Sequence, residues 1–177
     1  MDFLLLSPAQ KEQYRAQLFA LLEQGDNDFV PPLSARFSTS DTAFSAETVS
    51  KNGVLAYFND MIREDILAAV EDGALLGFVT FKKDLVKPPL DESTLPNLYI
   101  CTLLVDPAAR GRALTKRMYA HLFDTLYPNV NLYTRTWSTN AAHIAILSHF
   151  GFSLFKRIEN DRGPGIDTVY FEKKRLV

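Results

Sequence analysis

The chain has 177 residues, of which 47% are hydrophobic and 23% charged, with a formal net charge of −2 at pH 7. These values are typical of one globular domain with a sizeable core, whereas a general nucleic-acid binder is usually strongly basic. The single cysteine, Cys101, excludes an internal disulfide framework, and no Cys/His cluster has metal-ligand spacing, so we expect no metal. The sequence shows no basic leader and no apolar run of membrane length, so we expect a cytoplasmic protein without nucleic-acid or membrane partners.

The first predicted elements are a short edge strand at Phe3–Leu6 and a helix that follows it. Ser7 suits the N-cap of this helix and Pro8 its first position, and the helix should end at Gly25. Its apolar stripe is Tyr14, Leu18, Leu21 and Leu22. A second helix is expected over residues 54–62.

Residues 26–52, between these two helices, form an irregular segment rich in Pro, Ser and Thr. A long segment without regular structure inside a compact domain is either a functional loop or a disordered one. Phe29 and Phe37 make it too apolar for simple disorder, so we expect a loop that is either functional or packed for stability.

A β-hairpin is predicted next, from two apolar runs at 66–70 and 75–81 that flank Asp72-Gly73. The proline-containing segment 82–96 should be a loop. It leads into the apolar run Leu98–Val105, whose two alternating faces are both non-polar. This pattern predicts a central strand that is buried on both sides.

Positive charge gathers where this strand passes into an amphipathic helix whose stripe includes Leu114, Met118 and Leu122. Arg110 and Arg112 flank Gly111 at the helix start, although cations there cost about 0.3–1 kcal/mol each. The arrangement is explained by a bound anion such as phosphate, held by backbone N–H groups and arginines. A solvated basic patch is the alternative.

The C-terminal third predicts strands at 132–137, 152–158 and 168–171 and one helix between the first two. Ser138 or Thr139 should cap that helix, and Gly151 should end it. Strands with interspersed helices predict an α/β fold with a mixed, largely antiparallel sheet.

Two motifs together resemble the GNAT superfamily of N-acetyltransferases. The strand–turn–loop–helix unit carries Arg110, Ala113 and Thr115 where that family's loop has Arg or Gln followed by two small residues. The later segment runs from Asn140 to Gly151-Phe152 with the family's spacing. The resemblance implies a twisted sheet of about seven strands with about four helices. It also implies a single N-acetyltransferase domain over 1–177, with an acetyl-CoA-binding core at about 97–152.

The resemblance further implies transfer of an acetyl group from acetyl-CoA to an amine. The backbone of the central strand should pair with the pantetheine arm, the loop should hold the pyrophosphate, and Asn140 should contact the cofactor further along its arm. The implied cofactor-binding residues are Leu103, Leu104, Val105, Arg110, Gly111, Arg112, Ala113, Leu114, Thr115 and Asn140.

The usual catalytic groups of the family are missing. Leu147 stands where many members have a general-acid Tyr, and Cys101 where many have a general-base Glu. Ser148 and His149 are neighbours that could substitute, but we assign no catalytic residue.

Three features are candidates for contact with the acceptor. The loop that contains Phe29 corresponds to a substrate-facing segment of the family. Arg135 could bind an acceptor carboxylate, or be an edge-exposed strand arginine. Asp167 could hold a substrate amine, or cap the start of its strand.

The sequence leaves three functions open. The first is an N-acetyltransferase acting on a small-molecule or peptide amine by direct attack in a ternary complex. The second is a non-catalytic acyl-CoA-binding sensor with the same fold, and the third is another anion-binding α/β domain. A homodimer is possible, since dimers are common in the family.

Overall fold

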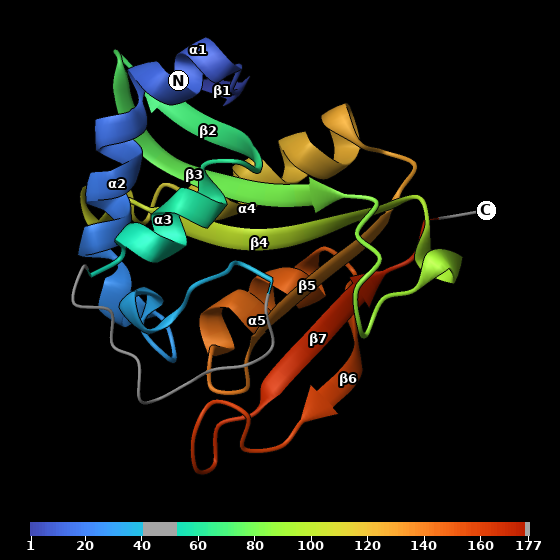
Figure 1. Cartoon of the computed structure of the whole chain (residues 1–177). Coiled ribbons are helices and arrows are strands. Elements are labelled where there is room, and N and C mark those ends of the chain that lie inside the picture. The colour runs from blue at the N-terminus through green and yellow to red at the C-terminus, as the bar shows by residue number, and fades with distance from the viewer. Residues whose placement is uncertain (41–52, 176–177) are drawn as a thin grey trace. The chain divides into compact units, whose positions relative to one another are not determined.

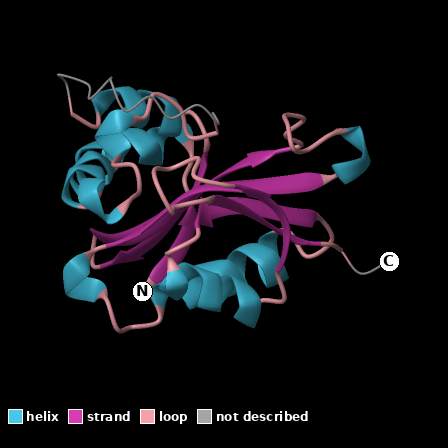
Figure 2. Ribbon diagram, turned by 90° about the horizontal axis from the view of Figure 1, so that it is seen from below, coloured by secondary structure: helices cyan, strands magenta, loops and turns pink. Residues whose placement is uncertain are grey.

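The structure is a computed structural model that describes residues 1–40 and 53–175. It contains seven strands in one sheet, in the order β1-β2-β3-β4-β5-β7-β6, and five α-helices among the described residues (Figures 1 and 2). The strands are β1 (Asp2–Leu5), β2 (Asp65–Glu71), β3 (Ala74–Lys83), β4 (Asn97–Val105), β5 (Asn131–Trp137), β6 (Ser153–Ile158) and β7 (Thr168–Lys173). The helices are α1 (Pro8–Gln13), α2 (Arg15–Gln24), α3 (Leu55–Met61), α4 (Leu114–Ala120) and α5 (Ala141–His149).

The sheet is mixed. Strand β2 pairs antiparallel with β1 and β3, and β7 pairs antiparallel with β5 and β6, whereas β4 and β5 are parallel. The predicted fold class, a mixed α/β sheet of about seven strands, is therefore confirmed. None of the described helices has the length and apolarity required to cross a membrane.

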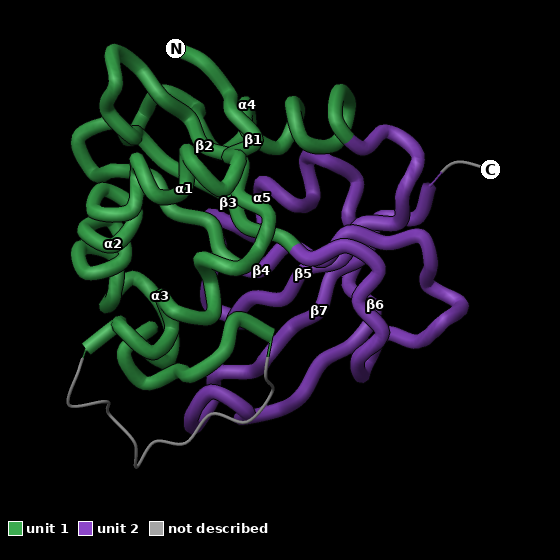
Figure 3. Tube along the Cα trace, turned by 45° about the horizontal axis from the view of Figure 1, so that its top comes forward, with its two compact units in different colours: residues 1–81, 102–126 green, residues 82–101, 127–177 purple. Residues whose placement is uncertain are grey.

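The chain divides into two compact units (Figure 3). Unit 1 is Met1–Phe81 with Thr102–Leu126, and unit 2 is Lys82–Cys101 with Tyr127–Val177. Strand β4 changes unit between Cys101 and Thr102.

In unit 1, helices α2 and α3 lie over one face of the β2–β3 hairpin and α4 lies over the other (Figures 1 and 2). The single helix predicted after Ser7 is in fact two, because Tyr14 leaves helical geometry with φ −92° and ψ 4°. Ser7 is the N-cap as predicted and forms a capping box with Gln10. The predicted apolar stripe of Tyr14, Leu18, Leu21 and Leu22 is buried.

The predicted hairpin is also confirmed. Asp72 (φ 52°) and Gly73 (φ 80°) both have positive φ, as a two-residue turn of type I′ requires. After β4, the 3₁₀ turn Pro107–Ala109 leads to α4, which continues as a π-helical turn, His121–Leu126.

Helix α5 in unit 2 begins differently from the prediction. Its N-cap is Asn140, not Ser138 or Thr139, since the Asn140 Oδ1 accepts a hydrogen bond from the His143 N–H (3.2 Å). The predicted end at Gly151 is confirmed. Gly151 has φ 78°, and the Phe152 N–H donates to the Leu147 carbonyl (3.0 Å), which is the hydrogen bond of a Schellman motif.

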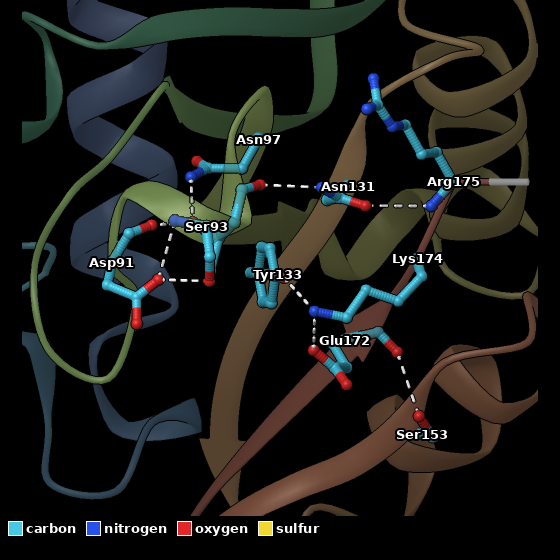
Figure 4. A network of polar contacts seen from close by, with 10 residues as sticks. Asp91, Ser93, Asn97, Asn131, Tyr133, Ser153, Glu172, Lys174 and Arg175 are labelled. Atoms are coloured by element: carbon cyan, nitrogen blue, oxygen red, sulfur yellow. Dashed lines mark hydrogen bonds and ion pairs between the residues drawn. The ribbon is translucent and has the colours of Figure 1, made fainter. Parts of the chain in front are cut away.

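Polar side chains tie the strands of unit 2 together near their ends (Figure 4). The Asn131 amide donates to the Thr94 carbonyl (2.8 Å), and its oxygen accepts from the Arg175 N–H (3.1 Å). The Lys174 ammonium lies between the Tyr133 hydroxyl (2.8 Å) and the Glu172 carboxylate (2.9 Å). These contacts fix the register of β5 against its neighbours.

Candidate cofactor site

The central feature of the site is the change in β4 after Ile100. Its parallel pairing with β5 covers Asn97–Ile100 against Asn131–Thr134, although β4 continues to Val105. Among the residues that the structure describes, no strand pairs with this edge of β4 beyond Ile100. Backbone N–H and C=O groups on such an edge are open to an extended ligand.

The burial of β4 changes at the same point. Residues Asn97–Ile100 are buried on both faces, as predicted. From Cys101 onward the prediction is wrong for one face, because Cys101, Leu103 and Val105 are only partly buried. The other face stays covered, and there the Thr102 hydroxyl bonds with the Tyr57 hydroxyl at 2.7 Å. One face of the second half of β4 is thus accessible.

Strand β3 supports this part of β4 from its other edge. A Cβ placed on Gly77 would lie 2.7 Å from the Leu104 carbonyl oxygen and 3.2 Å from the Val105 Cα. Only glycine allows the two backbones to approach so closely. The main chain of Leu104–Val105 is therefore held in place by another main chain.

The loop between β4 and α4 contains two residues in left-handed backbone conformations. Gly111 has φ 81°, and Ala113, the N-cap of α4, is left-handed with φ 55°. The first N–H groups of a helix have no intrahelical acceptor, and the methyl side chain of Ala113 cannot cap those of α4. Leu114 is buried and anchors the helix.

The two loop arginines already have carboxylate partners in unit 1. Arg110 Nη2 lies 2.6 Å from Asp28 Oδ2, and Arg112 Nη2 lies 2.8 Å from Glu71 Oε1. The hydrogen bond to Arg112 lowers the pKa of Glu71, and the same bond raises the pKa of Arg112. The ion pairs are exposed to solvent, so each contributes little to folding. An incoming anion would have to compete with two carboxylates.

Neither position that usually carries a catalytic group in the GNAT family offers one here. Leu147 is 0% exposed, so its side chain belongs to the core. The Cys101 thiol is partly buried and lies 3.5 Å from the Tyr99 carbonyl oxygen, to which it can donate. Ser148 and His149 are exposed on α5 and lie outside this core position.

The three candidate acceptor residues have different surroundings. Phe29 packs against the core of unit 1, with the Arg36 guanidinium 5.4 Å from its ring centroid; residues 41–52 of its predicted loop lie outside the described residues. Asp167 accepts a hydrogen bond from the Asn160 N–H (3.0 Å) and pairs with Arg157 (3.1 Å). These contacts fit the alternative in which Asp167 caps the start of its strand. Arg135 lies on β5 opposite Tyr170 of β7, one residue past the end of the β4 pairing at Thr134, and its side chain is partly buried.

Asn140 is in unit 2, where its side chain is used locally. Besides capping α5, its amide nitrogen donates to the Thr136 hydroxyl (3.0 Å). Sequence reasoning missed both contacts, although Asn is among the preferred N-cap residues and was a possible signal.

The model of the acetyltransferase (GNAT) family matches residues 36–152, about two thirds of the sequence. The chain therefore belongs to the GNAT acetyltransferase family. No curated protein sequence matches it.

Solved structures share the fold at low sequence identity. A ribosomal-protein-alanine N-acetyltransferase from Brucella melitensis superposes with a TM-score of 0.67 at 16% identity, covering 99% of this chain and 100% of that one. The aminoglycoside 6′-N-acetyltransferase from Enterococcus faecium gives a TM-score of 0.67 at 13% identity, covering 100% and 98%. A phosphinothricin acetyltransferase from Sinorhizobium meliloti, in complex with acetyl-CoA, gives 0.64 at 13% identity, covering 98% and 88%.

Proposed function

We propose that the protein is an acetyl-CoA-dependent N-acetyltransferase that acts on an amine of a small molecule or peptide. The observation that carries this proposal is the second half of β4, which leaves the β5 pairing after Ile100 and exposes one face just before the Arg-Gly loop. An extended pantetheine arm can pair with such an edge as an added strand would.

The residues proposed to hold acetyl-CoA follow from this placement. The backbone of Leu103 and Val105 would pair with the arm, with Leu104 holding the strand from its buried side. The loop residues Arg110, Gly111, Arg112, Ala113, Leu114 and Thr115 would hold the pyrophosphate through N–H groups and guanidiniums. Asn140 is proposed to contact the cofactor further along the arm.

Acetyl-CoA supplies the activated acetyl group when bound. Direct attack requires that the protein position the amine nitrogen against the thioester carbonyl carbon and exclude bulk water. Cys101 is partly buried at the position of the family's usual base, so we assign general-base catalysis to no side chain and infer that positioning dominates.

Thermal unfolding with and without saturating acetyl-CoA tests the cofactor assignment. Ligand at about 100 times its Kd stabilises the native state by roughly 2.7 kcal/mol, which raises Tm by several degrees. The double substitution Arg110→Ala with Gly111→Glu should abolish this shift while leaving the fold intact. Arg63→Ala, an exposed arginine of the same unit outside the loop, is the control. An unchanged affinity in the double variant would refute the pyrophosphate placement.

A non-catalytic acyl-CoA sensor is the second candidate, favoured by the buried Leu147 at the usual acid position. Release of CoA in the presence of a panel of amines separates the two functions. Turnover supports the enzyme, whereas acetyl-CoA binding without CoA release for any amine supports the sensor.

A further inference from the structure

Unit 2 contains a second group of chemically active side chains, which share one face of the sheet. Arg135 lies opposite Tyr170 in the antiparallel β5–β7 pair, so the two side chains are neighbours. Tyr99 lies opposite Tyr133 in the parallel β4–β5 pair, and Tyr133 is two residues from Arg135. Because side chains alternate along a strand, Tyr99, Arg135 and Tyr170 point to the same side.

A second guanidinium joins this face from the β6–β7 turn. Arg162 is only 8% exposed, its Nε donates to the Thr168 hydroxyl (2.9 Å), and its guanidinium carbon lies 5.8 Å from the Trp137 ring centroid. The Thr168 hydroxyl in turn donates to the Asp161 carboxylate. Arg162 is thus held in a fixed position inside the unit.

The two arginines lie close to the same buried phenol. Burial raises the pKa of Tyr99, and the positive charge of Arg135, followed by that of Arg162, opposes the rise. Among the described residues, this group brings together two guanidiniums and one carboxylate, that of Asp161. The nearby Glu172 is neutralised by Lys174 (Figure 4).

The Tyr170 hydroxyl gives an independent indication of a ligand. Tyr170 is 2% exposed, and its hydroxyl has no hydrogen-bond partner among the residues that the structure describes. A buried polar group without a partner costs about 1–3 kcal/mol. Such a group is rare in folded proteins and requires an explanation. A bound ligand that accepts a hydrogen bond from the Tyr170 hydroxyl would explain it.

The side chains of this face differ in burial. Arg135, Trp137 and Cys101 are only partly buried, whereas Tyr99, Tyr170 and Arg162 form the buried floor. A ligand that reaches the partly buried residues of this face would meet the Arg135 guanidinium and the Trp137 indole. Arginine is the residue best suited to planar carboxylates, because its N–H groups match the two oxygens.

We propose that this cluster, Tyr99, Arg135, Trp137, Arg162 and Tyr170, binds a carboxylate of the acceptor. The acceptor is then an amino acid or a peptide with a free carboxylate, and not a purely cationic amine. Arg135 and the Tyr170 hydroxyl contact the carboxylate, and Arg162 reinforces the positive potential. The substrate class rests on the proposed acetyltransferase function, but the binding of a carboxylate does not.

The test uses matched pairs of free acids and primary amides from a series of amino acids and dipeptides. Binding is measured by calorimetry with and without acetyl-CoA, and turnover by CoA release. We expect the best acid to exceed its amide at least tenfold in kcat/KM. Arg135→Gln and Tyr170→Phe should remove most of that preference, because they lower kcat/KM for the acid much more than for the amide. Arg157→Gln, an exposed strand arginine of the same unit, is the control.

Tyr170→Phe also separates a binding role from a structural one. Removing an unpartnered buried hydroxyl should leave the free energy of unfolding unchanged or raise it. Loss of acid preference in a variant that is at least as stable as the parent supports the proposal. Loss of stability would show a structural hydrogen bond and overturn it.

The outcomes also distinguish this inference from the proposed function. Equal use of acids and amides, or no acid bound while acetyl-CoA binds, overturns the carboxylate site and leaves the acetyltransferase intact. Acid binding that depends on Arg135, without any acetyl-CoA binding, supports the site and refutes the acetyltransferase.

Discussion

Arg110 and Asp28 are 82 positions apart in the sequence, and their side chains meet in an ion pair of 2.6 Å at the loop proposed to hold pyrophosphate. Their side chains are 53% and 51% exposed, so the pair is exchangeable. Asp28 thus competes with any anion for Arg110. Arg110 and Arg112 are thus both paired with carboxylates of the same unit.

We therefore expect Asp28→Asn to tighten acetyl-CoA binding. Exposed ion pairs contribute about 0.2–1 kcal/mol, so freeing Arg110 should lower Kd by roughly 1.4- to 5-fold. Calorimetric titration with acetyl-CoA measures this change, with Glu12→Gln, whose partner is Arg15, as the control. A weaker affinity in Asp28→Asn would mean that Asp28 positions the arginine instead of competing for it.

The left-handed Ala113 gives a prediction about stability. A non-glycine residue in this conformation costs about 1–2 kcal/mol, whereas glycine costs about 0.5–1 kcal/mol of extra chain entropy. Ala113→Gly should therefore leave the free energy of unfolding unchanged or raise it by up to about 1.5 kcal/mol. Ala113→Val should lower it by more than 1 kcal/mol, because a β-branched residue fits this geometry poorly. Urea unfolding tests both, and a destabilised Gly variant would contradict the strain argument.

Leu147→Tyr tests whether the family's usual acid can be restored on α5. Leu147 is 0% exposed, so its side chain is enclosed by the core. A larger, polar side chain in a packed core should lower the free energy of unfolding by about 1–3 kcal/mol. Ser148→Tyr, one residue along and exposed, should be nearly neutral. Equal stability of the two variants in urea would show that the core around Leu147 has room.

His143 should make the fold sensitive to acid. Burial lowers its pKa from 6.5 to about 4. Between these values the unfolded chain binds a proton that the folded chain excludes, so the free energy of unfolding falls as pH decreases from about 6.5 to 4. The largest slope is about 1.4 kcal/mol per pH unit.

His143→Gln should flatten that slope, and His149→Gln, an exposed position of the same helix, should not. Urea unfolding at several pH values between 4 and 7 provides the measurement. An identical slope in the parent and in His143→Gln would assign the acid sensitivity to other groups.

Much of the fold could be predicted from the sequence because local chemistry specifies it. Asp72-Gly73 suits a turn with two positive φ angles, and Gly151 suits the left-handed end of α5. The continuous apolar run identified β4, but it could not show that one face is less buried from Cys101 onward. That opening depends on where the β5 pairing ends, which is a property of two strands distant in sequence.

The site was harder to predict for the same reason. Arg110 and Arg112 were visible as charges, yet their partners Asp28 and Glu71 are far away in the chain. Tyr170 is an ordinary strand residue in sequence, and only the register of β7 against β5 places it beside Arg135.

The close approach at Gly77 has a consequence for how this chain can vary. Because main chain holds main chain at Leu104 and Val105, the side chains of the neighbouring loop do not set the position of the strand. If the loop holds the cofactor as proposed, substitutions in it can change affinity without moving the strand. Gly77 thus allows the residues of the loop to change during evolution while the position of β4 stays the same.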